Sequence, residues 1–140
     1  MDPNNPIVRL CVQGMEAEYA QRFDEARDLF EQAWREAASN FEACIAAHYV
    51  ARHQPSLDQT LWWNQLALAR ADRTRDPRVR PFYASLHLNL GKVYEDLGQI
   101  AQARMHYERA HTFLGEVIEG DYRSLVATGV SRALERTATA

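Results

Sequence analysis

The sequence lacks a long apolar segment. In 140 residues, no run approaches the roughly 18 consecutive apolar residues that a membrane-crossing helix needs. The first residues, MDPNNP, also lack the basic stretch and apolar core of a secretory signal. We therefore expect a cytoplasmic protein with no membrane association.

Positive charge is not in excess either. The 16 Lys and Arg residues against 19 Asp and Glu residues give a net charge of −3 and a pI near 5.9. General nucleic-acid binding requires a positive surface that displaces counterions from phosphate. We therefore do not expect nucleic acid as a partner, although a local basic site stays open.

Cysteine is scarce. Cys11 and Cys44 fall on apolar helical faces, without a Cys-x2-Cys motif or a nearby histidine. Small free thiols pack well in protein cores. We expect both to be buried and reduced rather than joined in a disulfide.

The residue patterns of catalysis and metal binding are also missing. No carboxylate pair, nucleophile elbow, phosphate loop or Ser/His/Asp set can be assembled. His48 and His53 lie five residues apart, as do His106 and His111, and this spacing does not stack two ligands on one helical face. We expect a protein with no enzyme activity, no metal and no cofactor.

The stretch LGKVYEDLGQIAQARMHYERA, residues 90–110, is the clearest pattern present. It predicts a helix, a tight turn at Gly98 and a second, antiparallel helix. The small and apolar residues recur at helical spacing, namely Leu90, Gly91, Tyr94 and Leu97, then Ala103, Tyr107 and Ala110. The pattern Leu-Gly-x2-Tyr followed by Ala-x3-Tyr-x2-Ala resembles the tetratricopeptide repeat signature.

Two further copies of this pattern precede it. Twelve residues separate Gly14 from Ala26, as they separate Gly91 from Ala103. The middle copy is degenerate, and we place Ala47 rather than His48 at its glycine position, because a close helix crossing has little room for an imidazole.

The resemblance implies an all-α, right-handed superhelical solenoid of three antiparallel helix pairs plus a C-terminal capping helix, seven helices in one domain spanning 1–140. The units are expected at about 7–40, 41–75 and 77–117, with the capping helix at about 121–136. We expect the fourth helix to reach Arg73 and the fifth to begin near Asp76. Asp121 is expected to cap the last helix, whose apolar face would run from Tyr122 to Leu134, and residues 137–140 to be disordered.

In proteins of this family, the first helix of each pair lines a concave groove that holds a peptide or a partner protein. The resemblance therefore implies a non-catalytic interaction module, similar to small stand-alone bacterial members of the family. The expected groove residues are Tyr19, Tyr49, Arg52, His53, Asn89, Lys92 and Glu95, with Glu18 on the same face. The Lys and Asn residues with which some members clamp a partner's terminal carboxylate are absent, since Cys11 and Met15 occupy two of those places.

Two alternatives remain open. Trp62 and Trp63 point about 100° apart on a helix, so one of them is expected to be exposed; with Arg78 and Tyr83, it would form the contact of a homodimer. The arginine-rich stretch from Arg70 to Arg80 would instead suit a small ligand or a polyanion. A solvated, internally paired stretch is the simpler interpretation of those charges.

Overall fold

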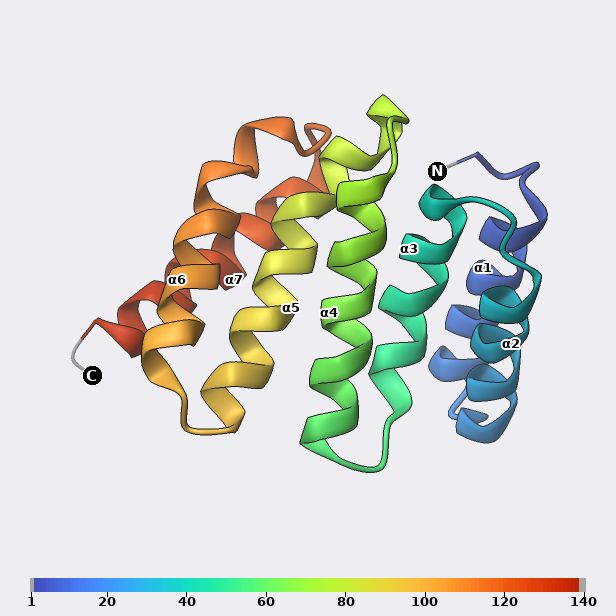
Figure 1. Ribbon diagram of the computed structural model, residues 1–140, viewed down its shortest axis with the longest axis horizontal. Helices are drawn as coiled ribbons and strands as arrows, with labels where there is room; N and C mark the ends of the chain where they lie inside the picture. Colours follow the sequence, from blue (N-terminus) through green and yellow to red (C-terminus); the bar gives the residue numbers. More distant parts are fainter. Residues whose placement is uncertain (1, 139–140) are drawn as a thin grey trace. The chain divides into compact units, whose positions relative to one another are not determined.

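The computed structural model describes residues 2–138, and the secondary structure of this part of the chain is entirely helical (Figure 1). The α-helices are α1 (Pro6–Tyr19), α2 (Phe23–Glu36), α3 (Asn40–Val50), α4 (Leu57–Arg73), α5 (Tyr83–Asp96), α6 (Ile100–Thr112) and α7 (Asp121–Thr137). The predicted all-α class and the seven helices are thus confirmed. None of the described helices combines the length and apolar character of a membrane span.

The chain divides into two compact units: unit 1 ends at Thr74 and unit 2 begins at Arg75. In unit 1, α1 and α2 form one antiparallel hairpin, and α3 and α4 form a second (Figure 1). Local side-chain chemistry begins these helices. Asn5 accepts hydrogen bonds from the backbone N–H groups of the first turn of α1, and Ser39 and Ser56 cap α3 and α4 in the same way.

The helix starts establish the register of the middle copy. The N-cap residues of α1 and α3, Asn5 and Ser39, are 34 residues apart, and the same step separates the N-cap residues of α2 and α4. This step places His48, not Ala47, at the position equivalent to Gly14, which corrects the predicted register. The residue equivalent to Phe30 is then Asn64, a smaller side chain that is also buried.

The two glycines of the repeat pattern lie where helices cross closely. A methyl group at Gly14 would be 2.3 Å from Cε1 of Phe30, and one at Gly91 would be 2.4 Å from Cε1 of Tyr107. Both distances are far below van der Waals contact. The same glycine–aromatic contact therefore joins α1 to α2 and α5 to α6, as the small residues in the pattern predicted.

The core of unit 1 is built from small residues around one aromatic ring. Phe30 is fully buried among Ala17, Ala26 and Val50. Cys11 and Cys44 are also buried, and both are free thiols, as expected. Burial raises the pKa of each thiol to about 12, so neither is a reactive thiolate at neutral pH.

Unit 2 begins with a 3₁₀ segment, η2 (Pro77–Phe82), before α5. Asp76 caps this segment by accepting from the backbone N–H of Arg78. The prediction of one long α-helix from Asp76 is therefore wrong, whereas α4 does end at Arg73. The physical reason is Pro81, which has no N–H for an α-helical hydrogen bond and whose ring, in an α-helix, clashes with the carbonyl four residues earlier.

The last helix also differs from its prediction. Gly120, not Asp121, is the N-cap residue of α7, and Thr137 belongs to the helix, where it is buried and its hydroxyl donates to the carbonyl of Ala133. Residues 139–140 of the expected disordered tail lie outside the described residues. Val126, Val130 and Ala133 form the buried face.

The predicted apolar face of α7 included two residues that the structure exposes. Tyr122 is 53% exposed and Leu125 is 71% exposed. Because Leu125 and Val126 are both apolar and adjacent, the pattern alone did not distinguish two faces about 100° apart.

Candidate functional site

Glu18, in the last turn of α1, joins two of the predicted groove residues in unit 1. One of its carboxylate oxygens lies 3.0 Å from Nε of Arg52 and 2.5 Å from Nε2 of His53. Arg52 and His53 belong to the 3₁₀ segment η1 (Ala51–His53) that follows α3. The Glu18 side chain is 13% exposed, so the carboxylate is well shielded and holds both partners in one place.

An aromatic layer lies beneath these polar groups. Tyr49 and His53 both stack on Phe30, with ring centroids 5.3 and 5.9 Å apart, respectively. The guanidinium of Arg52 lies 5.9 Å from the centroid of Tyr49. Since Phe30 is fully buried, Tyr49 and His53 rest on a fixed ring, and Arg52 lies over Tyr49. We call Glu18, Tyr49, Arg52 and His53 the Glu18 cluster.

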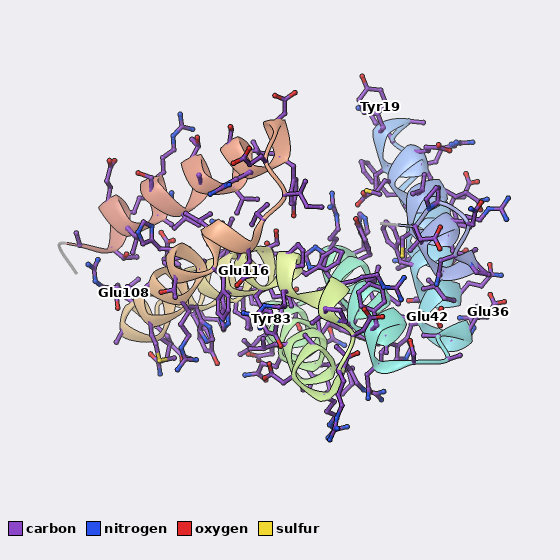
Figure 2. The ribbon with its side chains drawn as sticks, turned by 90° about the horizontal axis from the view of Figure 1, so that it is seen from above. Tyr19, Glu36, Glu42, Tyr83, Glu108 and Glu116 are labelled. Atoms are coloured by element: carbon purple, nitrogen blue, oxygen red, sulfur yellow. The ribbon has the colours of Figure 1, made fainter. Side chains whose placement is uncertain are left out.

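Tyr19 lies apart from these contacts. It is 94% exposed, and it extends into solvent beyond the end of α1 (Figure 2). Its position gives an aromatic ring at the edge of the Glu18 cluster without a structural role in the core.

Glu95 on α5, a predicted groove residue of unit 2, is held by hydrogen bonds within the molecule. Its carboxylate accepts a hydrogen bond from the Tyr107 hydroxyl at 2.6 Å and two from the Arg136 guanidinium at 3.0 and 3.1 Å. These groups, Arg136 first, hold the pKa of Glu95 below its ordinary value. Glu95 is therefore engaged within the molecule.

The remaining predicted residues of α5 are more open. Lys92 pairs with Asp96 at 2.9 Å in an exposed ion pair, and Asn89 is half-buried. The helix α7 covers the neighbouring part of α5, where Tyr122 contacts the hydroxyl of Ser85 and Gly129 faces Leu88. Part of the expected binding face of α5 is thus occupied by the chain itself.

Glu18 and Glu95 occupy equivalent positions, four residues after Gly14 and Gly91. Each accepts hydrogen bonds from an arginine on a following helical segment and from one further donor, His53 or Tyr107. Both residues were predicted on the binding face, and their hydrogen bonds within the molecule were not predicted. The sequence signal for this role is a Gly-x3-Glu spacing, which occurs in the first and third of the three predicted repeats.

A pocket of about 480 Å³ opens in unit 1 where α2 ends and α3 begins. Its lining includes Trp34, Arg35, Ser39, Asn40, Ala43 and Arg70. In the sequence, Arg70 stands out only as the first residue of the arginine-rich stretch. No spacing reveals this pocket, because α2, the α2–α3 loop, α3 and α4 all contribute to it.

The residues of the two alternative sites are distributed differently. Trp62 is 56% exposed, whereas Trp63 is half-buried, with its ring edge-on to Trp34 at 5.2 Å. In unit 2, Tyr83 stacks on Phe113, and the Arg78 guanidinium is held by Asp76. Of the predicted interface residues, Trp62 is therefore the exposed apolar one.

The arginine-rich stretch is not a continuous bare surface. Arg80 pairs with Glu116 at 2.9 Å and Arg78 with Asp76 at 2.6 Å. Arg70 belongs to the pocket of unit 1 described above. These ion pairs favour the interpretation that residues 75–80 form a solvated stretch whose charges pair within the molecule.

The histidines do not gather into a larger cluster. His87 and His106, both buried, face each other with 3.0 Å between their Nδ1 atoms, and burial lowers the pKa of His106. Within residues 2–138, no group of three His, Cys, Asp or Glu side chains is placed to hold a metal ion.

Neither the comparison with protein-family models nor the search of curated proteins gave a match.

Proposed function

We propose that this protein is a non-catalytic interaction module of tetratricopeptide-like, solenoid architecture that binds a peptide segment of a partner protein. The Glu18 cluster carries the proposal. It combines aromatic and arginine side chains, the residue types that dominate binding hot spots. Tyr49 and His53 are fixed on the buried ring of Phe30, and Arg52 is held by the Glu18 carboxylate. Fixed side chains lose little conformational freedom on binding, which favours affinity.

The chemistry of this surface suits a peptide. Tyr49 supplies a flat apolar contact, and Arg52, 49% exposed in its side chain, supplies charged donors beside it. Tyr19 adds an aromatic ring in solvent. In unit 2, Asn89 and Lys92 on α5 stay predictions from the sequence, whereas Glu95 is left out of the proposal because its carboxylate already binds Arg136 and Tyr107.

The test is selection of a displayed random peptide library on the wild-type protein, followed by affinity measurement with each selected peptide. The double variant Tyr19→Ala/Arg52→Glu alters exposed side chains and leaves the Phe30–Tyr49 stack in place. We expect it to lower affinity at least about tenfold, the loss typical of one hot-spot contact. The matched control is Arg27→Glu, which makes the same charge change on α2 and also breaks one exposed ion pair.

Amide chemical-shift mapping of the 16.1 kDa protein locates the peptide independently. Shifts centred on α1, α3 and η1 support the proposal. Selected peptides that bind both variants as tightly as the wild type, with shifts elsewhere, contradict it.

Self-association is a second candidate, favoured by one observation. Trp62 is 56% exposed on α4 while its neighbour packs against Trp34. A large exposed indole is costly in water and is typical of an interface anchor. A homodimer contact through Trp62 is compatible with peptide binding by the Glu18 cluster.

A further inference from the structure

The pocket at the start of α3 contains an arginine with unused hydrogen-bonding capacity. Arg70 donates from Nη1 to Oδ1 of Asn40 at 3.2 Å, and its guanidinium lies 5.5 Å from the centroid of Trp34. Its Nε is buried without a hydrogen-bond partner, and its Nη2 makes no hydrogen bond within the described residues. An unpaired buried donor costs about 1–3 kcal/mol, so this arrangement favours an additional acceptor.

A second arginine faces the same pocket. Arg35, at the end of α2, is exposed and has no carboxylate partner among residues 2–138. Three arginines of unit 1, Arg22, Arg27 and Arg52, each pair with an acidic side chain. In a protein of net charge −3, this pocket is therefore lined by two guanidinium groups, neither of which is in an ion pair within the described residues.

The nearest acidic side chain on α3 does not neutralise the pocket by pairing with either arginine. Glu42, labelled in Figure 2, accepts from the backbone N–H of Ala38 at 2.9 Å through one oxygen and from Nδ2 of Asn5 at 2.8 Å through the other. Both carboxylate oxygens are therefore engaged outside Arg35 and Arg70. Glu42 therefore occupies none of the N–H donors of Arg35 and Arg70.

We propose that this pocket binds an oxyanion group, a carboxylate or a phosphate, through Arg70 and Arg35. The planar guanidinium matches two oxygens of either group. Asn40 orients Arg70 through its Oδ1, and the Trp34 ring supports one face of the guanidinium. The site is separate from the Glu18 cluster, so either proposal can fail without the other.

The experiment is an NMR titration of the full chain in which sodium phosphate, or in a second arm sodium acetate, replaces sodium chloride at constant ionic strength. The reporters are the Nε–H resonance of Arg70 and the indole N–H resonance of Trp34. We expect saturable shifts of both in at least one arm. Saturation by phosphate alone assigns a phosphate ligand, by acetate alone a carboxylate ligand, and by both a general oxyanion site.

Three variants make the test specific. Arg70→Lys keeps the charge but loses the planar fork, and Arg35→Gln removes an exposed charge without disturbing the core. Each is expected to weaken binding about tenfold, the effect of losing one charge-assisted hydrogen bond. Arg73→Gln, an exposed neighbour on α4, is the matched control and should change affinity less than about twofold.

Two results overturn the proposal. One is the absence of saturation with either anion in the wild-type protein. The other is an equal loss of binding in Arg73→Gln and Arg35→Gln, because binding would then follow overall charge rather than this pocket.

Discussion

Single glycines determine how closely the helices of a hairpin approach. Gly91→Ala would place a methyl carbon 2.4 Å from Cε1 of Tyr107, a fully buried ring with no room to retreat. Overpacking of this kind costs about 1–3 kcal/mol, even after the better helix propensity of alanine. We expect the free energy of unfolding, measured with urea, to fall by about that amount.

Gly129→Ala is the control, because Gly129 is also helical but its added methyl would meet only the end of the Leu88 side chain, at 3.3 Å. That variant should be neutral or stabilised by up to about 1 kcal/mol. Equal destabilisation of both variants would contradict the close-crossing explanation.

His48 makes stability depend on pH. Burial, and secondarily the charge of Arg52, lowers the pKa of His48 from 6.5 to about 4. Between pH 6.5 and pH 4, His48 is protonated in the unfolded chain but neutral in the folded protein. The free energy of unfolding therefore falls as the pH falls from about 6.5 towards 4. We expect this half-buried side chain to account for at most about 2 kcal/mol of lost stability between pH 7 and 5.

The measurement is urea unfolding of wild type, His48→Gln and His111→Gln at pH 7, 6 and 5. His48→Gln should reduce the pH dependence, whereas His111→Gln, which changes an exposed residue of α6, should keep it. If the free energy of unfolding of His48→Gln depends on pH as strongly as that of the wild type, the loss of stability at low pH does not come from His48.

At the scale of elements, the carboxylate of Glu95, near the end of α5, links this helix to α6 and α7. Tyr107→Phe removes the hydroxyl that donates to Glu95 at 2.6 Å, while the ring keeps its contact with Gly91. Phe30, the equivalent residue of unit 1, shows that such a ring packs without a hydroxyl. We expect a loss of about 1–2 kcal/mol in urea unfolding, since the lost hydrogen bond is to a charged group.

The same substitution should raise the pKa of Glu95 towards its ordinary value, because one of the donors that lower it is removed. Side-chain carbon NMR measures this shift. Tyr19→Phe, at a 94% exposed position, should change neither quantity. An unchanged pKa of Glu95 in Tyr107→Phe would show that Arg136 alone holds its carboxylate.

Helix positions were well predicted where local chemistry decides them. α4 ends at Arg73, as predicted from the sequence, and Ser39 caps α3 through a hydrogen bond within the first turn. The prediction failed where two local signals competed. At η2, the capping signal of Asp76 predicts an α-helix start, but Pro81 cannot donate an α-helical hydrogen bond and the segment before α5 is 3₁₀.

For the whole molecule, Trp62 provides the test of self-association. If its exposed indole anchors a homodimer, sedimentation equilibrium of the wild type should show a mass that rises with concentration from 16.1 kDa towards twice that value. Trp62→Ala should remain monomeric. Leu57→Ala, at a 41% exposed position on the same helix, is the matched control and should associate like the wild type.

A wild type that stays monomeric at every concentration would remove Trp62 as a dimer anchor. Association that persists in Trp62→Ala would move the contact to another surface. Either result leaves the peptide-binding proposal to its own test.

The sequence by itself determined the helical hairpins of this protein. Caps such as Asn5 act within one helical turn, and spacings such as Gly14 to Ala26 act within one helical hairpin, so both can be read from residues close in the sequence. Tertiary structure decided which distant side chains meet. Glu18 reaches Arg52 and Arg70 reaches Asn40 across more than two dozen residues, because helix packing rather than sequence distance brings them together.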